Sequence, residues 1–139
     1  MDLPVSLITD VIRRGTILHS YMFEEIDHGK FFVVIGINEE FVAGFFFINS
    51  RINIHLEGKP EQLNMQYPLR RSDYEFLRYD SFLSVTNIEK ISIEKLSVSI
   101  QENITEIVGE MKKEHMEEIL ENARKSPLFS PHEIRQFFT

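Results

Sequence analysis

The chain has 139 residues, of which 42% are hydrophobic, and this is enough apolar material for the core of one domain. Its formal net charge of -7 argues against broad, non-specific binding of nucleic acid, which depends on Lys and Arg neutralising phosphates, but a local cationic groove stays compatible with it. The absence of cysteine excludes disulfides and cysteine zinc sites, and with no leader or long apolar stretch we expect a cytoplasmic protein with no membrane association.

The first predicted elements are a helix, a strand and a turn. Residues 2–15 indicate a short N-terminal helix, because Pro4 suits a helix start and Gly15 suits its end. Residues 16–23 have the composition of a strand, and residues 27–30 then form a plausible tight turn.

Two apolar runs in the middle of the chain predict a hairpin. Residues 31–37 and 41–48 are rich in aromatic and β-branched side chains, and the polar residues 38–40 between them are the right number for a hairpin turn. Strand alternation sends Phe46 to one face of the sheet and its two neighbours, Phe45 and Phe47, to the other. We expect all three in the core or at a dimer surface.

The next segment predicts shorter elements. Residues 51–56 alternate polar and apolar side chains, which is typical of a half-buried strand, and residues 63–69 are weakly extended. A capping box in residues 72–75 predicts a helix of one or two turns, ending at residue 77. Residues 80–93 indicate either one bent strand or a second hairpin.

Two helices are predicted at the C-terminal end. Residues 112–124 carry apolar side chains at helical spacing, and a second helix begins at Ser130, where a cap, a first-turn proline and a capping-box glutamate coincide. The whole order predicts a mainly β protein with added helices, of the α+β class, folded as one domain over residues 1–139. Short strands at hairpin spacing favour a small antiparallel barrel or coiled sheet over a parallel α/β fold.

No motif for a cofactor or a metal ion is present, and the five histidines stand too far apart for metal-ligand spacing on a predicted helix. A looser group of polar residues remains, at the start of one strand of the hairpin and at the end of the other. Because a turn and a strand end can share the rim of a barrel, we expect these side chains to converge on one groove. They are His19, His28, Lys30, Asn49, Ser50 and Arg51.

An ordered series of short blocks resembles the MazF/PemK toxin family. Residues 29–36 are similar to the family's Arg-Pro-x-x-Val-Ile-Ser strand, and residues 47–51 are similar to its Pro-Ile-Thr-Ser-Lys segment. Residues 77–81, 87–91, 94–96 and 107–111 resemble its later blocks, the last of them at the start of the family's final helix. The resemblance covers about residues 15–123 and implies an SH3-like barrel, a homodimer, an antitoxin partner and metal-independent cleavage of single-stranded RNA.

The resemblance also implies roles for individual residues. Lys30, or Phe31 if the register shifts by one, stands where the family has its catalytic arginine. Asn49 stands where the family's threonine positions the phosphate, beside Ser50. Lysine keeps the charge but lacks the planar, two-pronged grip of arginine, so this register implies a weakened active site.

The remaining assignments concern proton transfer and RNA contacts. His19 or His28 would donate the proton, and Arg51 would contact RNA together with Lys90 in the later strand. The alternative is a non-catalytic SH3-like barrel that binds a peptide or a partner protein through the same groove or through residues 45–47.

Overall fold

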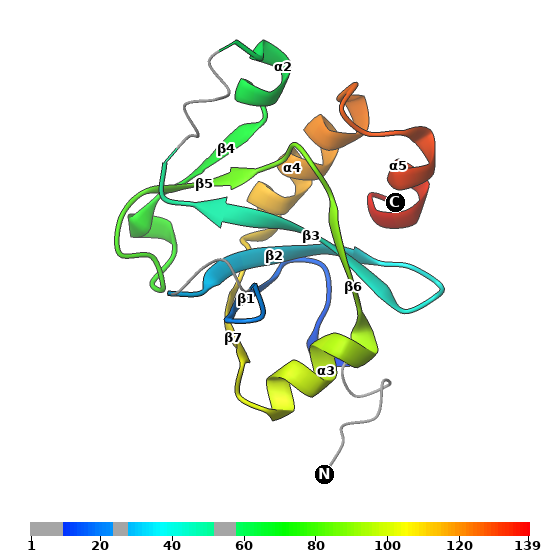
Figure 1. The fold of residues 1–139 in the computed structure, drawn as a ribbon. Coiled ribbons are helices and arrows are strands. Elements are labelled where there is room, and N and C mark those ends of the chain that lie inside the picture. Colours follow the sequence, from blue (N-terminus) through cyan, green and yellow to red (C-terminus); the bar gives the residue numbers. More distant parts are fainter. Residues whose placement is uncertain (1–9, 24–27, 52–57) are drawn as a thin grey trace.

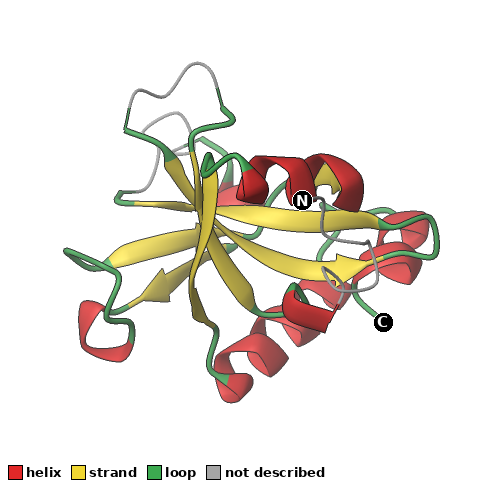
Figure 2. Cartoon of the chain, turned by 90° about the horizontal axis from the view of Figure 1, so that it is seen from below, coloured by secondary structure: helices red, strands yellow, loops and turns green. Residues whose placement is uncertain are grey.

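The computed structural model describes residues 10–23, 28–51 and 58–139, which form a strongly twisted antiparallel sheet with helices packed on both faces (Figure 1, Figure 2). The strands lie in the order β4-β5-β3-β2-β1-β7, and β6 also pairs with β3. In chain order the strands and helices are β1 (Thr16–Ser20), β2 (Lys30–Ile37), β3 (Val42–Asn49), α2 (Pro60–Leu63), β4 (Gln66–Leu69), η2 (Arg71–Asp73), β5 (Ser81–Ser84), β6 (Glu89–Ser92), α3 (Ile93–Gln101), β7 (Thr105–Glu110), α4 (Lys113–Lys125) and α5 (Pro131–Phe137). This arrangement confirms the α+β class.

The predicted SH3-like barrel does not close. Among the described residues, the edge strands β4 and β7 each pair with one neighbour only, β4 with β5 and β7 with β1. Side chains of α4 and α5 share one apolar cluster with side chains of β1 to β5. The two helices therefore supply part of the interior that a closed barrel would build from its strands alone.

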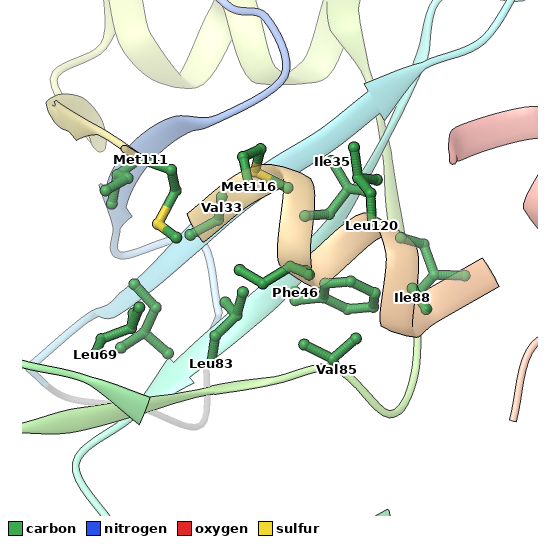
Figure 3. Packing of buried hydrophobic residues seen from close by; sticks show 14 of the residues in the cluster. Val33, Ile35, Phe46, Leu69, Leu83, Val85, Ile88, Met111, Met116 and Leu120 are labelled. Carbon is green, nitrogen blue, oxygen red and sulfur yellow. The ribbon is translucent and has the colours of Figure 1, made fainter. Parts of the chain in front are cut away.

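The central β2–β3 hairpin has apolar side chains on both of its faces, as its composition predicts. Phe46 packs on one face with Val33 and Ile35, and Met116 and Leu120 of α4 cover them (Figure 3). Residues 116, 119, 120 and 123 are all buried, which is the helical spacing expected from the sequence. This cluster is the larger of the two parts of the core.

The opposite face of the hairpin packs against α3. Phe45 is 2% exposed and lies with Phe32, while Ile93 and Leu96 come from the helix. Phe47 packs at the edge of the same cluster. The predicted alternation of residues 45 to 47 is therefore confirmed, and burial on two sides explains the continuous apolar runs in the sequence.

Residues 80–93 contain two short strands, β5 and β6, which pair with β3 and not with each other, so they form no hairpin, and an unpredicted helix follows them. β5 pairs with the end of β3, through Ile48 and Leu83, and β6 pairs with its beginning, through Gly44 and Lys90. Both segments thus run along one strand in the same direction. α3 then begins at Ile93, with Ser92 as its cap.

Several other predictions need correction or lie outside the described residues. The helix expected over residues 72–77 is only the short 3-10 turn η2, because Tyr74 is extended and directs its hydroxyl toward the start of α4. Residues 107–111 belong to β7 and the residue after it, so they precede the long helix rather than opening it. Residues 2–9 of the predicted N-terminal helix lie outside the described residues; residues 10 and 11 are helical but residues 12–15 are not, so the helix ends before the predicted Gly15. Of the strand predicted over residues 51–56 only Arg51 is described.

The C-terminal helix forms as predicted, with a complete capping box at Ser130, and it ends against the hairpin. Phe137 and Phe138 are buried there. Arg14 donates hydrogen bonds to the carbonyl of Phe137, at 3.1 Å, and to that of Ile35, at 2.7 Å. None of the described helices is long and apolar enough to cross a membrane.

Candidate functional site

A pocket of about 400 Å³ lies at the rim of the sheet, and we call it the rim pocket. The beginning of β2, the end of β3 and the loop between β4 and β5 meet there, at the left of Figure 1. The pocket is lined by His19, His28, Gly29, Lys30, Phe31, Ile48, Asn49, Ser50, Arg51, Phe76, Leu77, Arg78, Tyr79 and Ser81.

All but one of the site residues predicted from the sequence line this pocket. The antiparallel hairpin explains why, since Phe31 pairs with Ile48 and so brings Lys30, at the beginning of β2, near Asn49, at the end of β3. Lys90 does not take part, because β6 pairs with the opposite end of β3. Its predicted contact with RNA would therefore lie away from the rim pocket.

Lys30 holds the central position among the polar groups. Its ammonium group donates a hydrogen bond to Oδ1 of Asn49 and lies 5.4 Å from the ring centroid of Phe47. Partial burial lowers the pKa of Lys30 from its ordinary value of 10.5. An ammonium group offers three donors, and the described residues accept one of them, so Lys30 can bind an anion without giving up Asn49.

His19 is held in a defined orientation. Its Nε2 lies 3.2 Å from the carbonyl oxygen of His28, and because a carbonyl only accepts, this bond requires the proton on Nε2. The ring packs between Tyr21 and Phe31, at centroid distances of 4.9 and 4.6 Å. Gly29 makes room for it, since a Cβ there would lie 2.5 Å from Cε1 of His19. Among the described residues, none forms a hydrogen bond with Nδ1 of this ring.

The electrostatic character of the pocket contrasts with the acidic chain as a whole. Lys30, Arg51 and Arg78 contribute three cations, and none of the described lining residues is a carboxylate. Phe31 and Phe76 form an aromatic wall, with ring centroids 5.0 Å apart. Such a pocket suits an anion that carries a flat apolar group. In the described part of the chain no three His, Cys, Asp or Glu side chains come together as a metal site would need.

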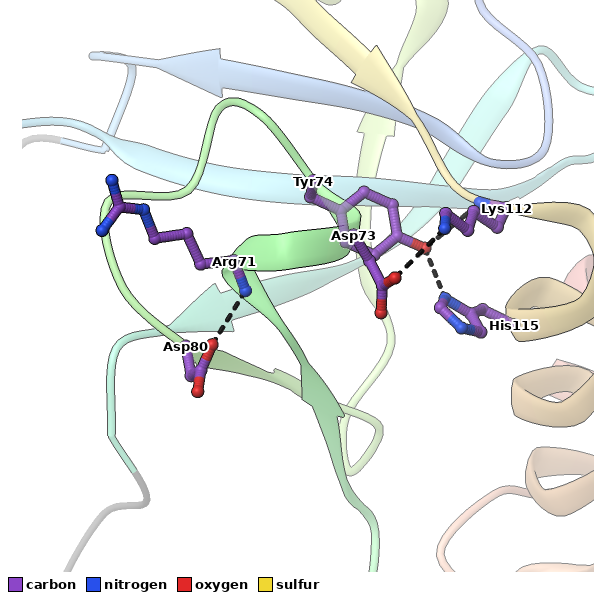
Figure 4. Close-up of polar contacts among 6 residues, drawn as sticks. All are labelled: Arg71, Asp73, Tyr74, Asp80, Lys112 and His115. Carbon is purple, nitrogen blue, oxygen red and sulfur yellow. Dashed lines mark hydrogen bonds and ion pairs between the residues drawn. The ribbon is translucent and has the colours of Figure 1, made fainter.

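The loop that supplies Phe76, Arg78 and Tyr79 is anchored to the start of α4 (Figure 4). The hydroxyl of Tyr74 lies 2.6 Å from Nδ1 of His115 and accepts the backbone N–H of Lys112 at 3.2 Å. The Lys112 ammonium also forms an ion pair of 3.1 Å with Asp73. Burial raises the pKa of Tyr74, which keeps this hydroxyl protonated as a donor. The loop therefore presents its outer residues from a fixed base.

Sequence reasoning assigned no site role to Phe76, Arg78 or Tyr79. A signal was present, because Arg70, Arg71 and Arg78 form a basic cluster within a few residues of an aromatic pair. What the sequence does not show is that this loop folds toward the ends of β2 and β3. That placement depends on contacts such as Tyr74 with His115, which are far apart in the chain.

No protein-family model matches the chain, and no curated protein matches it.

Proposed function

We propose that this protein binds single-stranded RNA in the rim pocket and cleaves the RNA backbone without a metal ion, as a toxin-type endoribonuclease. The observation that carries the proposal is the meeting of Lys30, Arg51 and Arg78 with His19 and His28, with no carboxylate among the described lining residues. Cations with imidazole groups in reach are what cleavage of a phosphodiester requires.

The reaction is an internal transfer of the phosphoryl group. The 2′-oxygen of a ribose attacks the neighbouring phosphorus while the bond from phosphorus to the 5′-oxygen breaks, giving a 2′,3′-cyclic phosphate and a free 5′-hydroxyl. A base removes the 2′-hydroxyl proton and an acid protonates the departing 5′-oxygen. His19 and His28 are the candidates for these two steps, and Nδ1 of His19 is the nitrogen left free by its bond to the backbone.

The phosphate would lie against the ends of β2 and β3. Lys30 would offset the charge that grows on the phosphoryl oxygens, and Ser50 beside Asn49 would donate a hydrogen bond to them. Because Lys30 is a single point charge already bonded to Asn49, we expect cleavage to be slower than a two-pronged arginine would allow.

The aromatic wall favours single-stranded RNA over a duplex. Phe31 and Phe76 line the pocket together, and Tyr79 is 60% exposed at its mouth. Bases stack on aromatic rings only when they are free of their own helix, and each such contact contributes about 1–3 kcal/mol.

The experiment incubates the protein with mixed-sequence single-stranded RNA in the presence of a chelator. We expect cleavage that leaves 2′,3′-cyclic phosphate ends, loss of cleavage in Lys30→Ala, and unchanged cleavage in the matched control Lys95→Ala, which removes an exposed cation of α3 that does not line the pocket. RNA that is neither bound nor cut by the unaltered protein would contradict the proposal and favour a non-catalytic protein that binds a peptide or a partner protein through the same groove.

The resemblance to the MazF/PemK family adds two proposals about partners, a homodimer and a protein antitoxin. Light scattering of the purified chain tests the first, and a mass of one chain across the working concentration range would contradict it. Inhibition of cleavage by a protein that binds with a defined stoichiometry would support the second.

A further inference from the structure

A second hollow lies directly beside the rim pocket. It is open, has a volume of about 670 Å³, and is lined by Arg70, Arg71, Ser72 and Asp80. Tyr79 and Ser81 line the rim pocket, whereas Asp80 between them lines the second hollow. The two hollows are therefore on either side of one short stretch of backbone. Because Leu69 pairs with Ser81, Arg70 leaves the sheet at the same place.

The arginines around these hollows are not neutralised by neighbouring acids. The ion pairs among the described residues are Arg13 with Glu110, Lys112 with Asp73 and Lys125 with Glu121. None of them involves Arg51, Arg70, Arg71 or Arg78.

The aspartates of the loop have other partners than these arginine side chains. The carboxylate of Asp80 accepts the backbone N–H of Arg71 at 2.8 Å, and the Arg71 side chain extends away from it (Figure 4). Asp73 is engaged by Lys112, and Glu75 lines neither hollow. No carboxylate in the described part of the chain therefore pairs with these guanidinium groups, which can bind an external anion.

The arrangement of these groups fits a chain of phosphates better than a single anion. Two cationic hollows are separated by the exposed ring of Tyr79, and the loop that carries them is fixed at its base by Tyr74. An acidic peptide would satisfy the charges but would give the ring of Tyr79 no flat partner. Nucleotides supply both, since phosphates alternate with bases along the strand.

We infer that single-stranded RNA bound in the rim pocket continues past Tyr79 into the second hollow, where Arg70 and Arg71 bind the phosphates of neighbouring nucleotides. This inference rests on the proposed function, because it assigns the same ligand to a longer surface. It predicts that affinity rises with the length of the RNA beyond what the rim pocket alone can hold.

The test uses two labelled oligonucleotides that the protein cannot cut, a trinucleotide and a decanucleotide, both with 2′-O-methyl groups that block the attacking oxygen. We expect the decanucleotide to bind more tightly than the trinucleotide. The double variant Arg70→Ala/Arg71→Ala should weaken the decanucleotide only. Each lost phosphate contact reduces the steepness of log affinity against log salt by about 0.7, so the loss of two contacts should reduce it by about 1.4. Near 0.1 M salt this corresponds to a decanucleotide affinity that is roughly 25-fold weaker.

Two matched variants make the result specific. The double variant Lys95→Ala/Lys113→Ala removes the same charge from exposed positions that line neither hollow, and it should leave both affinities unchanged. Tyr79→Ala should weaken the decanucleotide by about tenfold through the lost stacking contact. Thermal unfolding of each variant shows that the fold is retained.

The outcomes separate this inference from the proposed function. Failure of both oligonucleotides to bind the unaltered protein would refute the proposed function and the inference with it. Equal binding of both oligonucleotides, or an equal loss for both in Arg70→Ala/Arg71→Ala, would overturn the inference and leave the proposed function standing. Tighter binding of an acidic peptide than of the decanucleotide at these arginines would also overturn it.

Discussion

Adding a methyl group at Gly44 tests how the C-terminal helix is seated on the sheet. Gly36 and Gly44 pair with each other across the β2–β3 hairpin, and together they leave a flat area that Phe137 covers. A Cβ at Gly44 would lie 2.7 Å from Cδ1 of Phe137, and a Cβ at Gly36 would lie 2.4 Å from the Phe137 carbonyl oxygen. The first contact involves a side chain and the second involves backbone.

This difference sets the expected losses of stability. Gly44→Ala should lower the free energy of unfolding by about 1–3 kcal/mol, the usual effect of an extra methyl group in a packed core. Gly36→Ala cannot be relieved by a new rotamer of Phe137. The largest loss in free energy of unfolding expected for Gly36→Ala is that of undocking the helix. Undocking would expose Phe137 and Phe138, whose burial contributes about 1.5–3 kcal/mol each, or roughly 3–6 kcal/mol in all.

The assay is a double-mutant cycle measured by urea unfolding. In a Phe137→Ala background most of the penalty of Gly44→Ala should disappear, because Cδ1 of Ile88, at 3.0 Å, is then the remaining close contact, whereas the penalty of Gly36→Ala should persist. Gly58→Ala is the matched control, because a Cβ there meets nothing within 4 Å, and its effect should stay within about 0.5 kcal/mol. The reasoning fails if Gly44→Ala is as harmless as this control, or if its penalty is the same with and without the Phe137 ring.

Three further predictions concern the site and the pH dependence of the protein. Burial lowers the pKa of Lys30, so this side chain loses its charge, and the protein loses affinity for RNA, as the pH rises through a value below 10.5. Fluorescence anisotropy should show this fall in affinity in the unaltered protein and not in Lys30→Arg, because arginine stays charged. Burial and the hydrogen bond to Glu118 raise the pKa of Tyr67 above 10.0 in the folded state. The unfolded tyrosine therefore loses its proton first, and the stability that this group contributes is complete below pH 10.0 and declines as the pH rises further; urea unfolding on both sides of that value should show a smaller decline in Tyr67→Phe. Gly29→Ala would place a Cβ 2.5 Å from Cε1 of His19 at a backbone φ of +78°, so we expect RNA cleavage to fall by about 10²-fold or more, as in His19→Ala, and an unchanged rate would remove His19 from the mechanism.

The part of the site that could be predicted is the part that one hairpin determines. The register of an antiparallel hairpin follows from its turn, so the beginning of β2 had to lie near the end of β3 once the two apolar runs were recognised. The residue-by-residue pairing also depends on a bulge between Val34 and Gly36, which shifts the register by one residue before Phe31 meets Ile48. The helix over residues 113–125 could also be predicted from the sequence, because its buried positions repeat at the helical period. Both are local patterns.

The rest depends on contacts between distant segments. α3 escaped prediction because Ile91 and Ile93 alternate like strand residues, although Ser92 between them is in fact the cap of the helix. A short apolar run does not distinguish the two structures by periodicity alone. The rim position of Arg78 was hidden for a related reason, since it depends on Tyr74 reaching His115 across the molecule.

The acidic net charge of the chain and the cations of the two hollows act on RNA over different distances. At physiological salt the field of a surface charge is screened within about 8 Å, so a phosphate inside the rim pocket interacts with Lys30 and Arg78 and hardly at all with the distant acids of the chain. An RNA that approaches elsewhere meets a part of the chain in which acidic residues outnumber basic ones. Lowering the salt lengthens the reach of the acids as well as that of the arginines. The affinity of this protein for RNA should therefore rise less steeply at low salt than the number of its phosphate contacts alone would give.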